Sequence, residues 1–219
     1  MTDDVMEGMS RTGRIEWERM VSGQVYQDTH PDIDRQRERA ESLFMEYNRT
    51  GPGQKQKRRR ILEDLLGQVG QDVVINPDFR CEVGCNIRIG SQTLINYDAV
   101  MLDNAPITIG RNVWIGPGAG LFCTNHALDY EERKAGACQA RPIEICQGAW
   151  LGGHVVVLGG VRIGRGAVIG AGSVVTHDIP EQVVAVGNPC TVLRPITDAD
   201  RTGYLDRIRQ RDQENDQDQ

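Results

Sequence analysis

Large aromatic side chains are scarce in this sequence, where phenylalanine, tryptophan and tyrosine together make up 5% of 219 residues. This scarcity disfavours an ordinary layered core, which depends on large side chains. Glycine, by contrast, occurs 25 times. The chain is long enough to bury one good core. We therefore expect a core in which small aliphatic residues pack around repeated tight turns.

Long apolar runs and an excess of positive charge are also lacking. No stretch approaches the roughly 20 apolar residues that span a bilayer, and the first residues are acidic rather than signal-like. We therefore expect a soluble cytoplasmic protein without a membrane partner. The net charge of −6 disfavours a nucleic-acid partner, because phosphate contacts need a basic surface. One basic run, 55–60, is either the solvated face of a helix or a patch for an anionic ligand, and the first is favoured.

The six cysteines raise the question of a metal site. Cys81 and Cys85 have a C-x3-C spacing, but no second cysteine pair or nearby histidine completes a set of ligands. In a reducing compartment these thiols stay mainly reduced. We therefore interpret them as small core or turn residues and expect no metal.

The chain divides into four segments by composition and pattern. Residues 1–12 are predicted to be a flexible leader, and 13–70 an N-terminal helical segment in which 32–48 has helical spacing and 50–53 breaks it before a second helix. Residues 71–196 form the main domain. A C-terminal helix and polar tail occupy 197–219, with 212–219 polar enough to remain unfolded.

Aliphatic residues recur every six positions through the main domain. The thirteen positions, all but one of them Leu, Ile or Val, are Val83, Ile89, Ile95, Met101, Ile109, Ile115, Leu121, Ile145, Leu151, Val157, Ile163, Ile169 and Val175. Four residues after all but one of them comes a small or β-branched residue. Three such hexads close a triangular coil of 18 residues, in which Ile145 stacks on Ile163 and Leu151 on Ile169. The pattern predicts an all-β solenoid, a left-handed parallel β-helix of hexapeptide repeats with an N-terminal helical segment.

Two interruptions break this period, and interruptions in a repeat usually carry function. The step from Met101 to Ile109 has eight residues instead of six. The larger break separates Leu121 from Ile145, and we expect 124–144 to leave the helix as a protruding loop. Asn125 is the one polar residue among the inward small-residue positions, and it adjoins His126. A local rule that fails at one place indicates a functional site there.

Ordered motifs along the chain add a resemblance to the hexads. They are MVSGQVYQD (20–28), RERA (37–40), NIRIG (86–90), NYDAVMLD (96–103), NHALD (125–129), VIGAGSVVT (168–176) and AVGNP (185–189). Over 13–196 the sequence resembles the sugar O-acetyltransferases of the hexapeptide-repeat superfamily, the maltose, galactoside and nodulation acetyltransferase group. The resemblance implies transfer of an acetyl group from acetyl-CoA to a hydroxyl of a sugar or another small metabolite. It also implies a homotrimer with active sites between subunits.

The same resemblance assigns residues to roles. It makes His126 the general base, a role that suits a side chain whose ordinary pKa is near 6.5, and it assigns Asn96 to the catalytic residues as an acceptor-binding position. The acceptor-binding positions that it implies are Asp28, Arg37, Glu82, Asp103 and Asn125. The acetyl-CoA-binding positions are Trp150, Gly153, Ala171, Thr176 and His177, with the Gly153 N–H as the oxyanion donor. Three positions depart from the group: Glu82 replaces a shorter aspartate or serine, His177 a frequent lysine, and Thr191 a frequent arginine.

Two other functions fit the predicted fold. A γ-type carbonic anhydrase needs three histidines on neighbouring coils at a subunit boundary, whereas only His126 and His154 lie near the centre of the repeats. A catalytically silent β-helix scaffold needs the hexads alone, so His126 and its loop are unexpected in it. The sequence leaves the acceptor and the length of the acyl chain open.

Overall fold

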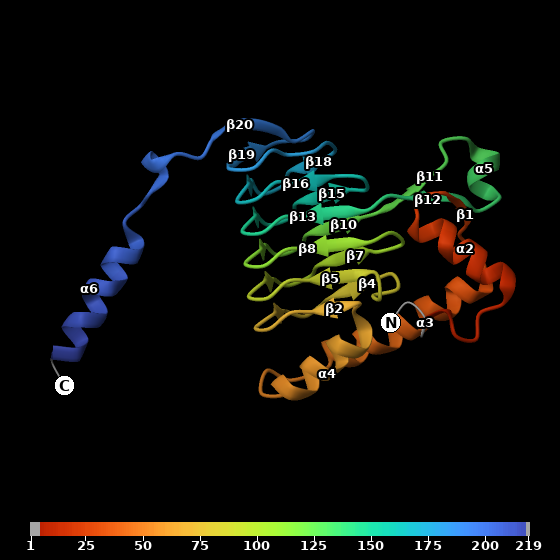
Figure 1. Cartoon of the computed structure of the whole chain (residues 1–219), viewed down its shortest axis with the longest axis horizontal. Helices are drawn as coiled ribbons and strands as arrows, with labels where there is room; N and C mark the ends of the chain where they lie inside the picture. The colour runs from red at the N-terminus through yellow and green to blue at the C-terminus, as the bar shows by residue number, and fades with distance from the viewer. Residues whose placement is uncertain (1–4, 218–219) are drawn as a thin grey trace.

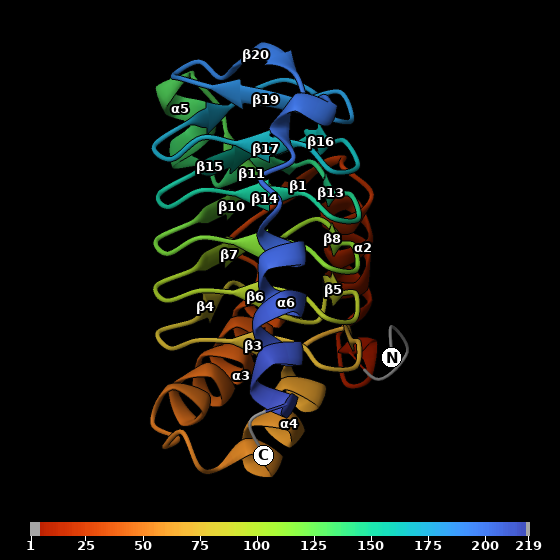
Figure 2. The ribbon, with the colours of Figure 1, turned by 90° about the vertical axis from the view of Figure 1, so that its left-hand side faces the viewer.

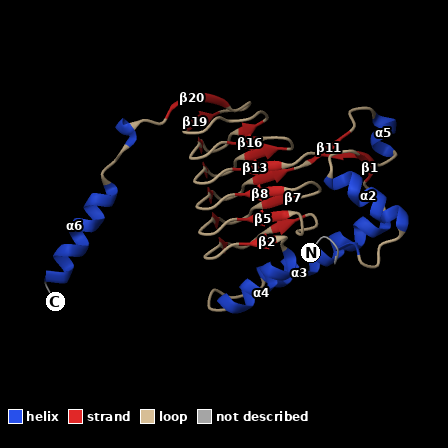
Figure 3. Cartoon of the chain, viewed as in Figure 1, coloured by secondary structure: helices blue, strands red, loops and turns tan. Residues whose placement is uncertain are grey.

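The computed structural model describes residues 5–217. It is a parallel β-solenoid with helices packed at one end and along one side (Figure 1). Figure 3 separates the helical elements from the strands of the coils. This architecture confirms the predicted solenoid with an N-terminal helical segment.

The N-terminal segment consists of helices α2 (Arg11–Val21), α3 (Pro31–Asn48) and α4 (Lys55–Leu65), with strand β1 (Val25–Gln27) between the first two. The Ser10 side chain caps α2 by accepting from the Gly13 N–H, which satisfies a donor that the helix leaves free. The predicted helices on either side of 50–53 are confirmed. In the basic run, Arg59 donates to the backbone carbonyls of Val69 and Gly70, so this arginine ties α4 to the first coil.

Three parallel sheets form the sides of the solenoid, and each coil visits them in the same order. The first sheet contains β2 (Gln68–Val69), β5 (Ile87–Ile89), β8 (Ile107–Ile109), β13 (Ile143–Ile145) and β16 (Arg162–Ile163). The second contains β3 (Val74–Ile75), β6 (Leu94–Ile95), β9 (Trp114–Ile115), β14 (Trp150–Leu151), β17 (Val168–Ile169) and β19 (Val183–Val186), and ends in the antiparallel β20 (Thr191–Pro195). The third contains β4 (Arg80–Cys81), β7 (Val100–Leu102), β10 (Gly120–Phe122), β15 (Val156–Leu158) and β18 (Val174–Val175). The chain thus turns repeatedly at a second–third corner and at a third–first corner.

Register within the sheets follows the hexads in the later coils. Ile145 pairs with Ile163 and Leu151 with Ile169, as predicted. The earlier coils are longer, since Val74 pairs with Leu94, 20 positions later. In the first coil, the inward hexad position also lies two residues earlier than predicted.

The residue of β4 that pairs with Met101 is Cys81, not Val83. Both Cys81 and Val83 are buried, which explains why hydrophobicity alone did not separate them. Extra residues at the third–first corner account for the shift, because the chain between β4 and β5 turns around the buried side chain of Asp103. The interpretation of Cys81 as a core residue is confirmed.

The interruption of the repeats is an ordered hairpin. Strands β11 (Thr124–His126) and β12 (Ala137–Ala140) pair antiparallel, α5 (Tyr130–Lys134) joins them, and β1 pairs with the other edge of β12. The coil resumes at β13, so the excursion ends before the predicted residue 144. The prediction that Asn125 fills an inward position is wrong, because the chain leaves the coil after the buried Cys123 and Asn125 is exposed.

The termini differ from the predicted boundaries. Helix α2 begins at Arg11 and Met9 is buried, so this part of the predicted leader packs on the protein, whereas residues 1–4 lie outside the described residues. A short 3-10 helix, η1 (Asp198–Asp200), precedes helix α6 (Tyr204–Gln217), which includes most of the tail predicted to be unfolded. Helix α6 stands clear of the solenoid in Figure 1 and crosses in front of the second sheet in Figure 2. Within residues 5–217, every helix is too short or too polar to cross a bilayer.

Candidate functional site

The predicted site residues fall on two corners of the solenoid, at opposite ends of the third sheet. The second–third corner carries Asn96 after β6, Gly153 after β14 and Ala171 after β17. The third–first corner and its hairpin carry Glu82, Asp103, Asn125, His126, Thr176 and His177. Trp150 lies on β14, where its side chain is exposed on the outer face of the second sheet.

One side of the triangular coil separates the two groups. A strand rises about 3.3 Å per residue, so the roughly six residues of one side place the corners on the order of 20 Å apart. Asn96 precedes β7 at one corner, whereas His126 follows β10 at the other. A single chain therefore does not bring Asn96 and His126 together.

His126 lies at the edge of the small sheet β1-β12-β11. It pairs with Cys138, which in turn pairs with Tyr26, so the three side chains form one row on the same face of this sheet. Tyr26 and Cys138 are buried, whereas His126 is exposed. The Tyr26 hydroxyl donates to Asp28 Oδ1 at 3.0 Å, and burial raises the pKa of Tyr26, which keeps it a donor. The row thus connects the histidine strand to Asp28.

Arg37 is the centre of a charged cluster beside this row. Its Nε donates to Glu82 Oε1 at 2.6 Å, its Nη2 to Asp28 Oδ1 at 2.6 Å, and its Nη1 to Asp34 Oδ1 and the Asp28 carbonyl, both at 2.8 Å. Burial by itself lowers the pKa of Arg37, but the carboxylates of Glu82 and Asp28 outweigh burial and raise it. The structure thus brings together three of the predicted acceptor residues. It adds Asp34, whose spacing of three residues from Arg37 on one helix was an available signal.

Asp103 belongs to the framework of the corner. Its side chain is fully buried, and its carboxylate accepts four backbone hydrogen bonds, from Glu82, Val83 and Gly84 at Oδ1 and from Asn86 at Oδ2. These contacts give Asp103 a structural role, since its carboxylate holds the backbone of its own corner. Its acceptor-binding role stays a prediction.

The neighbouring Asn104 was missed by sequence reasoning. It is buried, and its Oδ1 accepts a hydrogen bond from the Thr124 hydroxyl, two residues before His126. The extra residues between Met101 and Ile109 were the available signal, because they lie at this position. Asn104 thus links the root of the hairpin to the preceding coil.

At the second–third corner, several backbone N–H groups donate no hydrogen bond to the described residues. Those of Gly153 and Ala171 are among them, although the N–H groups of the adjacent His154 and Gly172 are paired. Unpaired N–H groups on a turn can stabilise a developing negative charge. Asn96 lies at the same corner, where its Oδ1 accepts from the Tyr97 N–H and from Asn76 Nδ2.

Two tryptophans stack on the outer face of the second sheet. Trp150 pairs with Trp114 on the adjacent strand, and the two side chains are 53% and 58% exposed. Together with Asn112 and Gly148 they line a shallow hollow of about 290 Å³. Trp114 was also missed, although it occupies the position that corresponds to Trp150 in the neighbouring coil.

Known relatives and solved structures match this chain over most of its length, and two family models match parts of it. Residues 19–70 match the maltose acetyltransferase hexapeptide capping motif, and 142–177 match the bacterial transferase hexapeptide family. The galactoside O-acetyltransferase of Escherichia coli is 38% identical over 188 residues, which cover 86% of this chain and 93% of that protein.

Two solved structures add a match in three dimensions. A maltose O-acetyltransferase from Clostridium difficile has a TM-score of 0.81 at 38% identity, over 84% of this chain and 98% of that one. A hexapeptide-repeat acetyltransferase from Vibrio cholerae, solved in complex with acetyl coenzyme A, has a TM-score of 0.78 at 38% identity, over 87% and 100% of the two chains.

This chain belongs to the hexapeptide-repeat acetyltransferase family. Membership confirms the family that the motifs indicated and the enzyme class that the resemblance implied. The capping-motif match includes α3, which holds Arg37, and β1, which directly precedes Asp28. The hexapeptide match spans the coils that carry Gly153 and Ala171.

The histidines of this acetyltransferase are dispersed. His30 caps α3, His154 lies at the second–third corner, and His177 lies at the third–first corner, where its Nδ1 is 2.8 Å from the Thr176 hydroxyl. Within residues 5–217, no three His, Cys, Asp or Glu side chains are grouped to hold a metal. One chain therefore does not present the three-histidine set of a γ-type carbonic anhydrase.

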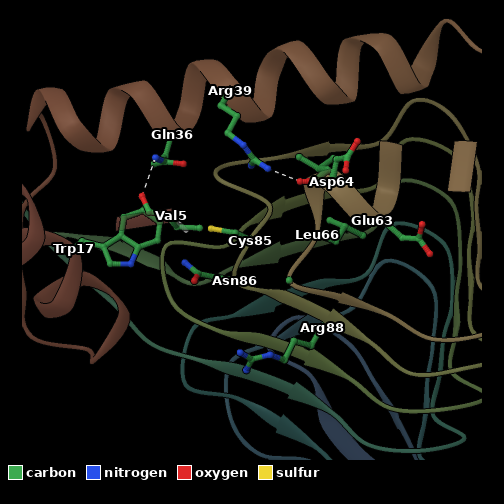
Figure 4. Close-up of a pocket in the computed structure, with 12 residues that line it drawn as sticks. Val5, Trp17, Gln36, Arg39, Glu63, Asp64, Leu66, Cys85, Asn86 and Arg88 are labelled. Carbon is green, nitrogen blue, oxygen red and sulfur yellow. Dashed lines mark hydrogen bonds between the residues drawn. The ribbon is translucent and has the colours of Figure 1, made fainter. Parts of the chain in front are cut away.

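A separate cavity lies between the helices and the first coils of the acetyltransferase (Figure 4). It has a volume of about 310 Å³, and its lining includes Trp17, Arg39, Asp64 and Arg88. Arg39 donates to the Asp64 carbonyl across it. None of the predicted site residues lines this cavity, although Cys85 and Asn86 of the third–first corner do.

Proposed function

We propose that this acetyltransferase moves an acetyl group from acetyl-CoA to a hydroxyl of a sugar or a similar small polyol, at sites formed between two copies in a homotrimer. The observation that carries the proposal is the division of the site residues between two corners of one chain. His126 and the acceptor residues lie at one corner, and the free N–H groups of Gly153 and Ala171 lie at the other. A three-fold assembly that sets one corner against the other corner of a neighbour completes each site.

His126 acts as the general base in this proposal. The acceptor hydroxyl attacks the thioester carbonyl carbon, and His126 takes its proton as the new C–O bond forms. The carbonyl oxygen becomes negatively charged and accepts a hydrogen bond from the Gly153 N–H of the adjacent copy. Collapse of the intermediate breaks the C–S bond, and protonated His126 returns the proton to the leaving sulfur.

The relatives support the two substrates. Galactoside and maltose acetyltransferases are named for sugar acceptors, and the Vibrio cholerae structure contains acetyl coenzyme A. Trp150, Thr176 and His177 stay predicted contacts for the donor. A cytoplasmic location likewise stays a prediction.

The His126→Ala variant tests the catalytic role. Positioned proton transfer contributes about 10²- to 10⁴-fold in rate, so we expect kcat to fall by that factor while KM for acetyl-CoA changes little. The measurement is thiol release from acetyl-CoA with an alkyl galactoside. His177→Ala is the matched control, with the opposite expectation of a raised KM and a retained kcat. An unchanged kcat in His126→Ala would rule out the general-base role.

A subunit-mixing experiment tests the shared site. We expect His126→Ala and Asn96→Ala to be inactive alone, because each removes one half of every site. When the two variants are refolded together in equal amounts, about a quarter of the wild-type activity should return. Each site then has a one-half chance of an intact His126 from one subunit and a one-half chance of an intact Asn96 from its neighbour. A monomer by light scattering, or no recovery in a mixed trimer, would contradict a site built from two copies.

A further inference from the structure

We propose that the carboxylates around Arg37 make the acceptor side of the site acidic, so that it takes neutral or amino-substituted hydroxyl compounds and rejects acceptors that carry a carboxylate or phosphate. The inference rests on the proposed function and adds the chemical class of the acceptor to it. Glu82 is the residue on which this selection depends most.

Arg37 has little capacity left for a substrate. A guanidinium carries five N–H groups, and four hydrogen bonds to Glu82, Asp28 and Asp34 already use most of them. The charge of Arg37 is also matched by more than one carboxylate. Although Arg37 is a cation at the predicted acceptor site, it cannot bind an anionic acceptor bidentately without releasing its present partners.

The groups that remain open are acceptors of hydrogen bonds. Among the described residues, no hydrogen bond reaches Asp28 Oδ2 or Glu82 Oε2, because Arg37 and Tyr26 contact only the other oxygen of each carboxylate. Asp28 and Glu82 are each 23% exposed, so water reaches them without surrounding them. Such oxygens match the hydroxyl groups of a polyol and the N–H groups of an ammonium.

Both carboxylates are linked to the strand that carries His126 through intervening residues. The Asp28 N–H donates to the Gly136 carbonyl next to β12, which pairs with β11. On the other side, the Glu82 N–H donates to Asp103, and the next residue, Asn104, bonds Thr124 at the start of β11. An acceptor whose hydroxyl reaches His126 is therefore within the field of this cluster.

The charges in the cluster favour one class of acceptor over another. Three carboxylates face one guanidinium, which leaves a net negative charge in a partly enclosed site. Like charges repel more strongly where water is partly excluded, and such repulsion discriminates between ligands. A neutral sugar gains hydrogen bonds here, an ammonium gains attraction as well, and an anion meets repulsion.

The test uses three galactosides that keep every ring hydroxyl and differ only in the charge of a short substituent: ethyl, 2-aminoethyl and carboxymethyl. The measurement is kcat/KM from thiol release with acetyl-CoA. For the wild type we expect the carboxymethyl compound to be at least about tenfold poorer than the ethyl compound, a factor equal to about 1.4 kcal/mol. Glu82→Gln should reduce the ratio of kcat/KM for the ethyl compound to kcat/KM for the carboxymethyl compound about tenfold. The control is Glu46→Gln, the same chemical change at a residue of α3 about 13 Å along the helix from Arg37. It should leave the ratio of the two kcat/KM values unchanged.

Binding measurements separate this inference from the proposed function. If no galactoside is acetylated, the proposed function fails, and calorimetric titration of the three galactosides still decides the charge preference. Equal affinity or equal kcat/KM for the carboxymethyl and ethyl compounds in the wild type would overturn the inference. If Glu82→Gln does not fold, Asp34→Asn is the second variant, with a smaller shift expected in the same direction because Asp34 is 50% exposed.

Discussion

Replacing Asp103 by alanine removes the acceptor of four backbone hydrogen bonds at once. The N–H groups of Glu82, Val83 and Gly84 donate to Oδ1, and that of Asn86 donates to Oδ2. These donors belong to the corner that positions Glu82. Asp103→Ala therefore tests whether this carboxylate stabilises the corner or contacts a substrate.

The structure sets the size of the expected effect. The bonds from Val83 and Gly84 are buried, and a buried donor left without a partner costs about 1–3 kcal/mol. Asp103→Ala should therefore lower the free energy of unfolding by about 2–6 kcal/mol, since the more exposed Glu82 and Asn86 can turn to water. Asp103→Asn keeps an oxygen at Oδ1 and sets a nitrogen against the Asn86 N–H, so it should cost about 1–2 kcal/mol.

The Asp103 carboxyl also predicts a pH dependence of stability. Burial raises its pKa to about 6, although the backbone hydrogen bonds act in the opposite direction. In the unfolded chain an aspartate titrates near 3.9. Between these values the native state binds more protons than the unfolded state, so stability falls as pH rises through this window. The expected loss is up to about 3 kcal/mol between pH 4 and 6, and Asp103→Asn should lack this contribution.

Urea unfolding followed by tryptophan fluorescence, at one fixed protein concentration, measures these effects. A loss below about 1 kcal/mol in Asp103→Ala would contradict the structural role, because the buried donors could not then be unsatisfied. The same slope between pH 4 and 6 in Asp103→Asn and in the wild type would contradict the raised pKa. Acetyltransferase assays at pH 7.5 add a separate criterion. A structural Asp103 predicts that folded Asp103→Asn keeps its KM for the acceptor.

Two further predictions concern packing. A Cβ at Gly67 would lie 2.2 Å from the Cys85 carbonyl oxygen, so Gly67→Ala should destabilise the protein by about 1–3 kcal/mol, whereas Gly53→Ala, with open space around it, should stay within about 0.5 kcal/mol of the wild type in urea unfolding. Equal stability of these two variants would contradict the close approach of the backbones. Trp17 is 4% exposed and Trp114 58%, so Trp17→Ala should cost about 3–5 kcal/mol and Trp114→Ala well under half of that, and the reverse order by thermal unfolding would refute the packing of α2.

The hexads predicted the coil because each repeat is a local pattern. Ile145 stacks on Ile163 wherever three hexads close one turn, and the structure confirms that register. The extra residues before Ile89 escaped this reasoning, whereas the pairs of Ile95 with Ile115 and of Met101 with Leu121 agree with the predicted positions. The extra residues are accommodated around the Asp103 carboxylate, and no property of a single position indicates that four distant N–H groups converge on it. Val83 was assigned the hexad position that Cys81 occupies, because both residues are buried and hydrophobicity does not separate them.

The sequence identified the candidate residues of the site better than it predicted how they are arranged in space. The break in the repeats located the hairpin that carries His126, but Asn125 was assigned to the interior because the sequence does not mark where the chain leaves the coil. Arg37 was recognised through a motif. Its hydrogen bond to Glu82, 45 residues away, follows only from the docking of α3 against the third–first corner.

The sequence by itself determined the solenoid, the position of its interruption and the family, because period and motif order are written along the chain. Only the tertiary structure decided how the side chains are used. In the folded chain the Asp103 carboxylate binds backbone N–H groups, and most N–H groups of Arg37 donate to carboxylates. Asn96 and His126 lie at opposite ends of one sheet. Those outcomes depend on contacts between residues of different coils and helices, which come together only when the coils stack. Such contacts leave no periodic pattern in the sequence.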